Sequence, residues 1–497
     1  MNIIPLFVVV PLGAAFLISL LGKKIKGIPD ILANSGTLLL TVLSVCAIFL
    51  VKGAGVQVYK VGGWIPPIGI SMVLDGLSSF MLVTVNLTAF LITIFSISYM
   101  EKYTAKWKFY TLFMLMLAGM NGVIITGDMF NLFVFLEIAA IASYALVAFG
   151  IEKEELEASF KYMVVGELAS LFILLGIGLL YSFTSTLNMA DMGRVLVADG
   201  PGKLVPFVSV LFLVGFGIKA AIMPFHAWLA DAHPSAPAPI SAMLSGLLIK
   251  VLGIYALMRI FFNVLGVGPS ILNILLTLGT ISMVAGGLLA IGQSDIKRML
   301  AYSSISQIGY IVLALGIATP LALLGAIFHL FNHAIFKSLL FLNSGAIEYS
   351  TGTRDLNEMG GLNARMPLTG TTSLIGSMSI SGIPPLGGFW SKLIIVFAAI
   401  KSGHTVLGLI AILVSIITLG YYLKLQRYAF LGSLKDKWKS VREVPFTMKL
   451  SMVMLALICI ATGVLLLPGI REAFLGMAQD ALSIGKDYAA VTFESIK

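Results

Sequence analysis

Six ionisable side chains lie deep inside apolar segments that are long enough to cross a lipid bilayer. They are Glu137, Lys219, Lys250, His329, His333 and Lys392. A charged side chain at the centre of a bilayer costs from about 3 to more than 10 kcal/mol, so such groups face a bundle interior or a wet cavity and often mark an ion path. The sequence therefore predicts a proton path built from these residues.

Glu137 stands near the middle of its apolar segment, in the stretch 130–142. A lone carboxylate removed from water becomes neutral, whereas one beside a lysine stays ionised. We interpret Glu137 as the electrostatic partner that loads and unloads a lysine. The alternative is a structural hydrogen bond to a neighbouring helix.

Lys219 and Lys250 lie on successive apolar segments. A lysine removed from water can exchange its proton near neutral pH, whereas an arginine stays charged, so these residue types favour proton handling over anchoring. The alternative is that their amines extend toward the membrane surface. Lys250 follows about 12 mostly apolar residues and precedes about 8, which places it too deep for that. Lys219 lies beside a predicted helix break and can reach water there.

His329, His333 and Lys337 are spaced by four residues. On a helix this spacing forms one stripe that rises about 12 Å. Imidazole accepts and donates protons near neutral pH, so the stripe can pass protons through intervening waters. A structural histidine is one alternative. A shared metal ion is another, but no H-E-x-x-H motif and no third ligand accompany the pair, so no metal site is predicted.

Lys392 follows the Pro384-Pro385 pair and is predicted to be the terminal residue of the path, close to its far exit. Three further residues are predicted to have accessory roles. Glu167 is expected to be a buried carboxylate, with helix packing as the alternative. His226 and His233 lie at or just after the first helix break and are expected to form an inlet or exit relay.

The composition indicates an integral membrane protein of the all-α class. Hydrophobic residues make up 59% and charged residues 11% of the chain, whereas soluble domains contain about 25% charged residues. About 14 apolar runs approach the length of a membrane-spanning helix. They cover residues 3–21, 30–51, 77–98, 107–126, 129–149, 158–181, 204–228, 238–262, 270–291, 297–316, 319–345, 367–400, 404–426 and 446–468.

Prolines interrupt two of these runs, at 219–239 and at 382–387. Proline removes a backbone donor and clashes with the preceding helical turn, so a break is predicted in each. Interrupted helices in both halves of a transporter point to inverted repeats with an ion site near the midplane. The segment 52–76 is predicted to form a small hairpin on the outer face, and the tail after Pro468 a short interfacial helix.

The formal net charge of +9 lies in short loops, where it reports topology and not nucleic-acid binding. About 18 Lys and Arg residues fall on one face and about 9 on the other. The richer face, which includes the cluster 435–442 and Lys297, is predicted to be cytoplasmic, so both termini lie outside a cell (inner) membrane. The first run lacks signal-peptide features and is expected to stay as the first helix. Cys46 and Cys459 alone predict no iron–sulfur cluster, and no cofactor is expected.

Four stretches carry a family resemblance: 130–137, 219–237, 295–307 and 382–389. With them, the chain resembles the antiporter-like subunits shared by respiratory complex I, membrane-bound hydrogenases and the Mrp-type multisubunit cation/proton antiporters. The resemblance runs over nearly the whole chain. Its length and lysine pattern are most similar to the D subunit of the Mrp antiporters and the corresponding hydrogenase subunit.

The resemblance implies a 14-helix fold with two inverted five-helix repeats and a hydrated central axis. The expected division is N-terminal helices at 1–106, a first repeat at 107–262, a second repeat at 270–426, and a C-terminal helix and tail at 446–497. In that family the matches to Glu137 and Lys219 form the coupling pair. Lys250 and either His329 or His333 match the connecting residues, and Lys392 matches the terminal one.

The chain is thus expected to be a proton-translocating subunit of a larger membrane complex, with other membrane subunits as partners. The coupling is expected to be Na+ exchange or a redox module. The alternatives are a proton-pumping subunit of a hydrogenase or complex I-like oxidoreductase, a stand-alone solute transporter, and an inert scaffold. No covalent chemistry is expected in the chain itself.

Overall fold

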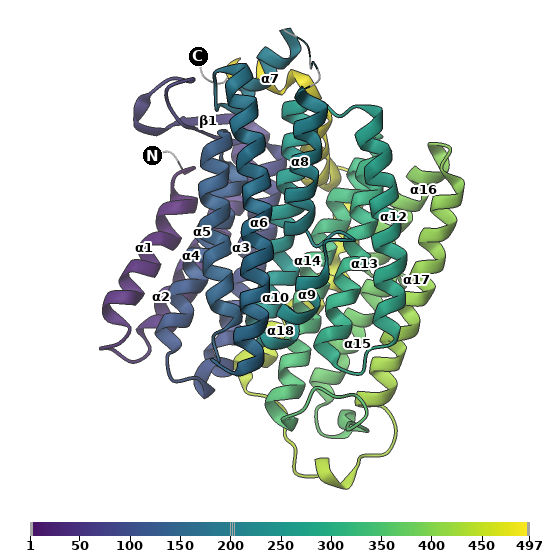
Figure 1. Ribbon diagram of the computed structural model, residues 1–497. Coiled ribbons are helices and arrows are strands. Elements are labelled where there is room, and N and C mark those ends of the chain that lie inside the picture. Colours follow the sequence, from purple (N-terminus) through teal and green to yellow (C-terminus); the bar gives the residue numbers. More distant parts are fainter. Residues whose placement is uncertain (1–2, 199, 201, 203, 495–497) are drawn as a thin grey trace.

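The computed structural model describes residues 3–198, 200, 202 and 204–494, and it is a bundle of long helices that run side by side (Figure 1). Eleven of the described helices are long and apolar enough to cross a membrane. The apolar helices of the first half are α1 (Leu6–Leu21), α2 (Ile28–Ala54), α3 (Gly76–Tyr99), α4 (Lys106–Ile125), α5 (Met129–Val147), α6 (Lys153–Thr184) and α8 (Leu204–Lys219).

The second half continues the same architecture. Its apolar helices are α12 (Pro269–Ile291), α13 (Ile296–Ile317), α14 (Pro320–Thr351), α15 (Pro367–Ser381), α16 (Gly387–Lys401), α17 (Thr405–Leu425) and α18 (Phe446–Ala461). Between the halves, α10 (Ala238–Met243) and α11 (Ala256–Met258) belong to one continuous helical run that ends at Leu265. The prediction of an all-helical membrane protein is confirmed.

Each of the 14 predicted apolar runs contains at least one helix. Helices α1 and α8 are shorter, with 16 residues each, and the long run 367–400 divides into α15 and α16, with 15 residues each. The break predicted at 382–387 therefore divides this run into two helices. That all 14 runs cross the bilayer stays a prediction.

Both predicted helix breaks are present. Helix α8 ends at Lys219, and the chain runs through Pro224 before α9 (Ala227–Ser235) begins. At Ala221 the backbone has φ of 54°, which lies outside the right-handed helical region. Helix α15 ends at Ser381, and α16 begins at Gly387 after the two prolines. The prolines explain why the breaks fall here, since each lacks the backbone donor that a helix needs.

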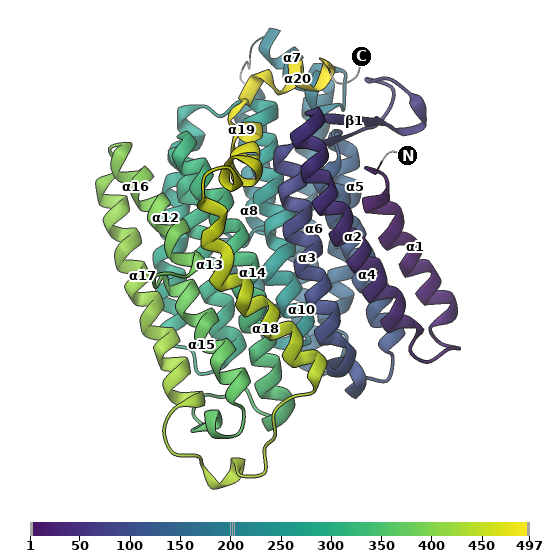
Figure 2. The same cartoon turned by 180° about the vertical axis from the view of Figure 1, so that it is seen from behind.

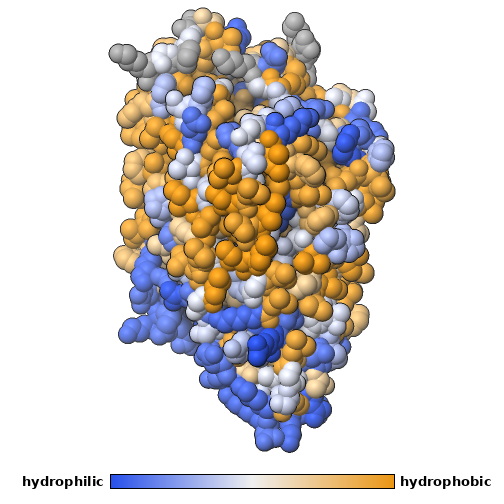
Figure 3. Space-filling model, turned by 90° about the vertical axis from the view of Figure 1, so that its right-hand side faces the viewer, coloured by the Kyte–Doolittle hydropathy of each residue, from blue (hydrophilic) through white to orange (hydrophobic). Residues whose placement is uncertain are grey.

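Three helical runs form the core that surrounds the predicted path. The most apolar stretch of the run 238–265 and that of α14 are 100% buried, and that of α13 is 94% buried. The corresponding values for α2, α17 and α18 are only 33%, so these helices lie at the periphery. On the face in Figure 3 an apolar band lies above a strongly hydrophilic lower end. The buried ionisable residues therefore lie inside the bundle and not on its lipid-facing surface.

The helical run that carries Lys250 is wound more widely than its neighbours. Residues Leu244–Tyr255 and Arg259–Leu265 are π-helical. Gly253 in this run lies so close to Ala220 that a Cβ at position 253 would overlap with it. A side chain at 253 would separate the two elements, so Gly253 brings the Lys250 helix directly against the first break.

The described residues also form one two-stranded antiparallel sheet. Strand β1 (Gln57–Lys60) pairs with β2 (Ser71–Leu74), with Gln57 opposite Leu74, which confirms the predicted hairpin. The hairpin lies at the end of the bundle that holds α7 (Met189–Ala198) and the tail helices α19 (Met477–Ser483) and α20 (Tyr488–Glu494) (Figures 1 and 2). The tail is helical as predicted, and its position at a membrane surface stays a prediction.

A buried ion pair joins the elements at this end. The two terminal nitrogens of Arg259 lie 2.7 and 2.9 Å from the two carboxylate oxygens of Asp75, and their side chains are 4% and 3% exposed. The Arg259 guanidinium also lies over the ring of Tyr488, 5.4 Å from its centroid. Asn263 donates to the carbonyl of Ala481 at 2.9 Å. The end of the Lys250 helix nearest the hairpin is thereby tied to the start of α3 and to the tail.

Replacing Gly388 by alanine is expected to destabilise the second break. A Cβ at 388 would overlap with the main-chain carbonyl of Ser379, which cannot move as a flexible side chain can. Overpacking of this kind costs about 1–3 kcal/mol. Thermal unfolding of the purified complex should show a lower midpoint for Gly388→Ala. Gly420→Ala, on α17 with open space around it, is the control, and equal midpoints in the two variants would contradict the prediction.

Candidate functional site

Glu137 and Lys219 face each other between α5 and α8. The Lys219 Nζ lies 3.7 Å from the Glu137 Oε1, and the two side chains are 4% and 16% exposed. The hydroxyl of Ser170 on α6 donates to the same carboxylate oxygen. Lys219 donates to the Tyr144 hydroxyl at 3.4 Å. Each charged group thus has a second, neutral partner, so the pair can separate without leaving either group bare.

Glu167 is exposed on α6, so its predicted burial is wrong for this chain on its own. Its neighbour Gly166 faces inward, whereas Glu167 does not. The position of a residue along a helix does not determine which side of the helix it occupies. The Glu167 carboxylate interacts electrostatically with Tyr144, Lys219 and Glu137. Tyr144 therefore connects Glu167 with the buried pair.

An aromatic stack fixes the first break against this pair. The Trp228 indole on α9 donates to the Ile218 carbonyl at 3.0 Å and stacks on Tyr162 with ring centroids 4.2 Å apart. Tyr162 in turn meets Tyr144 edge to face at 4.6 Å. The chain before and after the break is thus held against Tyr144 by contacts between rings.

Lys250 is 1% exposed and donates to the Ser245 carbonyl five residues earlier in its own π-helical segment. Lys337 on α14 is fully buried and donates to the Leu300 carbonyl at 2.7 Å and to the Tyr422 hydroxyl at 3.3 Å. The two lysines interact electrostatically. Neither has a carboxylate partner among the described residues.

His329, His333 and Lys337 lie on one face of α14, and all three are fully buried. The two imidazole rings have centroids 6.4 Å apart. His329 Nδ1 and the Ser391 hydroxyl are 3.0 Å apart, which links the stripe to α16. His333 interacts electrostatically more with Lys250 than with Lys392, and His329 more with Lys392 than with Lys250. The stripe therefore lies between the two lysines that it was predicted to connect.

Lys392 is buried beside the second break. Its ammonium donates to the Ile380 carbonyl at 2.8 Å, across the break, and lies 4.7 Å from the centre of the Tyr310 ring. The carbonyl is near the end of α15, where the helix no longer supplies a donor for it. The break thus supplies a polar partner for an amine inside the bundle.

The structure separates the two accessory histidines. His233 is fully buried and interacts electrostatically with Lys250, Lys337 and Lys297, so it lies in line with the buried residues. His226 is half-buried at the break, with its ring nitrogen 3.3 Å from the Pro224 carbonyl and its ring 6.4 Å from that of Tyr302.

A buried ion pair between Lys297 and Glu348 was not predicted from the sequence. Lys297 was predicted to lie on the basic face, at the start of the run 297–316, but its side chain is only 2% exposed, and its Nζ lies 2.9 Å from the Glu348 Oε2. The first turn of α13 turns Lys297 toward α14, which the loop count did not take into account. The signal was present, because Glu348 follows Lys337 by 11 residues, about three helical turns, and so shares its face of α14.

Many buried polar atoms along this line have no protein partner. In the described part of the chain they include both ring nitrogens of His233 and of His333, Nε2 of His329, both amide atoms of Gln307, and the hydroxyl of Ser379. Buried polar groups in native proteins are hydrogen-bonded to protein or to ordered water. These atoms therefore indicate water positions beside the histidines.

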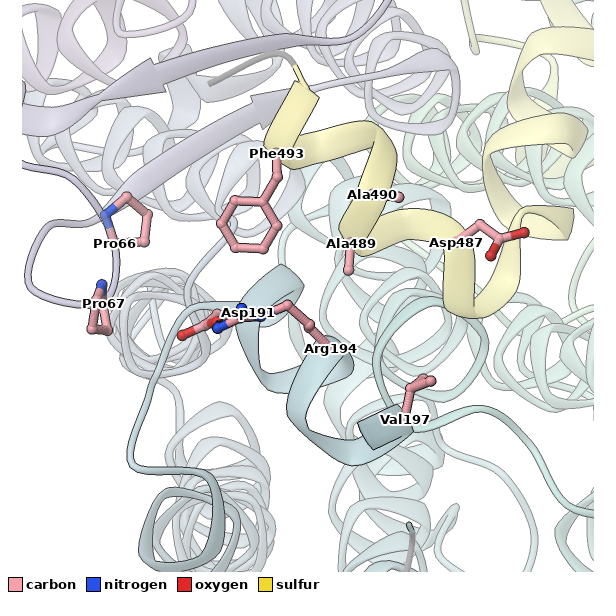
Figure 4. A pocket seen from close by; sticks show the side chains of 9 residues that line it. All are labelled: Pro66, Pro67, Asp191, Arg194, Val197, Asp487, Ala489, Ala490 and Phe493. Atoms are coloured by element: carbon pink, nitrogen blue, oxygen red, sulfur yellow. Dashed lines mark hydrogen bonds and ion pairs between the residues drawn. The ribbon is translucent and has the colours of Figure 1, made fainter. Parts of the chain in front are cut away.

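The described residues include no group of three or more His, Cys, Asp or Glu side chains placed to hold a metal ion. A cavity of about 530 Å³ lies at the hairpin end of the bundle, between the hairpin loop, α7 and the tail. There Asp191 and Arg194 of α7 face Phe493 of α20 (Figure 4). It contains none of the predicted path residues, so it is a separate feature.

Comparison with known proteins assigns the family. A sequence family described as "NADH:quinone oxidoreductase/Mrp antiporter, TM" matches residues 126–418. A second, "NADH-Ubiquinone oxidoreductase (complex I), chain 5 N-terminus", matches residues 64–110. The chain is a member of the complex I/Mrp antiporter-like subunit family. The resemblance predicted from the four stretches is confirmed, and this family member is a multi-pass integral membrane protein.

Two curated relatives show the breadth of this family. The chain is 38% identical over 382 residues to the D subunit of the Na(+)/H(+) antiporter of Alkalihalophilus pseudofirmus, which covers 77% of each protein. It is 36% identical over 449 residues to the N subunit of the NADH-quinone oxidoreductase of Desulforudis audaxviator, which covers 89% of this chain and 88% of that protein. The predicted similarity to the Mrp D subunit is confirmed, and a complex I-type relative is nearly as similar.

Two solved structures share the whole fold of this antiporter-like subunit. A chain of the Mrp complex from Dietzia superposes with a TM-score of 0.90 at 29% identity and covers 99% of this chain and 98% of that one. A chain of the membrane-bound sulfane sulfur reductase, an archaeal respiratory membrane complex, gives 0.89 at 33% identity and covers 98% and 99%. Both are structures of membrane complexes.

Replacing Gly166 by alanine is expected to move Tyr144 away from Lys219. A Cβ at 166 would overlap with the Tyr144 hydroxyl, the group to which Lys219 donates. A structure of the Gly166→Ala variant in its complex should place the Tyr144 hydroxyl beyond hydrogen-bond distance of the Lys219 Nζ. Gly178→Ala, on the same helix with open space around it, should leave the distance unchanged. An unmoved hydroxyl in Gly166→Ala would contradict the prediction.

Proposed function

We propose that this chain translocates protons as an antiporter-like subunit of a multisubunit membrane complex. The observation that carries the proposal is the row of buried titratable side chains, whose unpartnered polar atoms need water. Lys219, Lys250, His333, His329 and Lys392 form the core of the path. Glu137 is the partner of Lys219, and Lys337, His233, His226 and Glu167 are accessory to it.

The lysines fall into two classes, and each class suits a different task. Lys219 has a carboxylate 3.7 Å from its amine, so its charge is balanced and can be changed by moving Glu137. Lys250, Lys337 and Lys392 have only carbonyl or hydroxyl acceptors among the described hydrogen bonds. Like charges in a medium of low dielectric repel strongly. A proton on one of these lysines therefore disfavours a proton on the next lysine. This repulsion drives the proton along the row.

The two histidines are suited to pass the proton between these lysines. Neutral imidazole carries one donor and one acceptor nitrogen, so it can take a proton on one side and release one on the other. His333 interacts with Lys250 and with Lys392, and His329 interacts with the same two lysines. The transfer steps run through water, because both rings retain unpartnered nitrogens.

The driving process that we favour is exchange against Na+, because D subunits of Na(+)/H(+) antiporters are among the most similar relatives. A redox-driven complex is the second candidate. It is favoured by the similarity to the N subunit of NADH-quinone oxidoreductase and to a chain of the sulfane sulfur reductase complex. Purifying the native complex and identifying its subunits separates these candidates, and a chain that purifies alone and carries a solute would contradict both.

We further propose that 107–262 and 270–426 are the two inverted repeats, with helices 1–106 before them and the segment 446–497 after them. Each proposed repeat contains one broken helix and one lysine beside the break. The lysine precedes the first break and follows the second, so the two proposed repeats do not match in this detail. The excess of basic residues at the lower end of Figure 1 favours that end as cytoplasmic, with both termini outside.

Glu137→Ala and Lys219→Ala are each expected to reduce proton flux at least tenfold while the complex still assembles. Each substitution leaves the other member of the buried pair without its charge partner. The measurement is proton flux into vesicles that contain the purified complex, with and without a Na+ gradient. Lys401→Ala is the control, because Lys401 is exposed near the end of α16. Wild-type flux in both pair variants would favour an inert scaffold.

Ordered water is expected within hydrogen-bond distance of both ring nitrogens of His333 and of His233. Four buried nitrogens without a protein partner require it. A high-resolution map of the complex tests this expectation directly. The internal control is Asn86, which is equally buried but satisfied by Ser44, Leu82 and Asn121, so no water is expected at its side-chain amide. Dry density around both histidines would contradict the proposed path.

A further inference from the structure

A charged cavity opens at the end of the bundle opposite the hairpin. It has a volume of about 290 Å³ and is bounded by the start of α6, by α9, and by residues at the start of α13 and just after α14. Its lining combines acidic and basic side chains with the backbone around Pro234 and Ser235. The charged lining residues are Glu154, Glu157, Lys161, Asp231, Asp295, Arg298 and Arg354.

Arg354 is the lining residue from which contacts lead inward. Its guanidinium donates to the carbonyl of Pro234, and its Nε lies 3.1 Å from the Asp295 carboxylate. The same Nε lies 3.9 Å from the Glu348 Oε1. Arg354 thus connects the cavity wall with a carboxylate that does not line the cavity.

Glu348 and Lys297 form the next contact inward. Their charged atoms lie 2.9 Å apart, with the lysine side chain 2% exposed and the glutamate side chain 24% exposed. Lys297 also donates to the Ala236 carbonyl at 3.1 Å. Tyr99 and Lys102, from the end of α3 and the turn after it, interact electrostatically with Glu348 as well. The glutamate therefore stays partly accessible to solvent, while the lysine is sealed within the bundle.

His233 is the group on the inner side of this pair. It is fully buried, and it interacts electrostatically with Lys297 as well as with Lys250 and Lys337. Both of its ring nitrogens lack a protein partner. The residue is also adjacent in sequence to Pro234, which lines the cavity. A polar group that is fully buried and unpartnered, between an ion pair and two lysines, points to a proton acceptor.

We propose that this cavity is a proton inlet and that the Glu348–Lys297 pair is the gate between it and His233. The inference rests on the proposed proton translocation. Glu348 takes a proton from hydronium in the cavity, which leaves as water, and becomes neutral, so Lys297 loses its counter-charge. Lys297 gives a proton to His233, and neutral Glu348 then returns its own to Lys297. One proton has moved inward, and the ion pair has formed again.

The test is proton uptake from the cavity side by the intact complex in vesicles, measured as initial rate against pH. Glu348→Gln keeps the shape of the side chain but cannot take up a proton, so the rate should fall at least tenfold. Glu348→Asp keeps the carboxylate and should recover at least a third of the wild-type rate. Glu358→Gln is the matched control, because Glu358 pairs with Lys437 at the same end of the bundle but is exposed and lies outside the route.

Three results would overturn the gate. They are wild-type uptake by Glu348→Gln, a loss that Glu348→Asp does not recover, and an equal loss in Glu358→Gln. Lys250→Ala, measured in the same assay, tests the proposed path itself. If Lys250→Ala stops flux and Glu348→Gln does not, the gate alone is wrong. If neither changes flux, the proposed function is wrong as well.

A second measurement tests whether the cavity lies on the route. Ser235 lines the cavity, and Cys46 is the exposed cysteine among the described residues. In a Cys46→Ser background, Ser235→Cys should react with a charged thiol reagent added on that side, and flux should then fall at least fivefold. The background without Ser235→Cys should be unaffected. Labelling without loss of flux, or no labelling, would overturn the inlet.

Discussion

The cost of holding an ammonium group inside an apolar bundle determines much of this structure. Five of the lysines that the structure describes are buried, at positions 219, 250, 297, 337 and 392. Of these five, only Lys219 and Lys297 face carboxylates. Lys219 pairs with Glu137 beside the first helix break, and Lys297 pairs with Glu348. The other three rely on main-chain carbonyls and hydroxyls, which accept hydrogen bonds but do not neutralise charge. These three lysines therefore have no carboxylate among the described residues that would balance a positive charge on them.

The backbone supplies what the side chains lack. Lys392 uses the carbonyl of Ile380, near the point where α15 ends, and Lys250 uses that of Ser245 within a π-helical segment. A regular helix engages nearly all of its carbonyls in its own ladder, so departures from regular winding free acceptors inside the membrane. Glycines then let the irregular segments pack closely, as Gly253 does against Ala220. Buried amines are thus solvated by carbonyls that the helix breaks and the π-helical turns leave free. Small residues allow these irregular segments to pack closely.

Much of this arrangement could be predicted from the sequence, because charges within apolar runs and prolines within helices are conspicuous. The helical class, both breaks, the hairpin and the burial of Lys219, Lys250, His329, His333 and Lys392 were all predictable for that reason. Glu167 and Lys297 were not, since which side of a helix a residue occupies depends on packing against helices that are distant in sequence. Position along the helix suggested burial for Glu167 and exposure for Lys297, and the structure has the reverse. The ion pair of Asp75 with Arg259 was not predicted for the same reason.

That ion pair also restricts how the Lys250 helix can move. Asp75 binds both terminal nitrogens of Arg259, and Asn263 donates to the tail, so the third of this helix nearest the hairpin is anchored against rotation and sliding. Its inner part meets the first break through Gly253 and has no comparable anchor of charge among the described residues. A displacement that starts at the Lys219 break would thus twist the helix about the end that Arg259 and Asn263 hold in place. The π-helical turns around Lys250 are the section that is free to absorb that torsion.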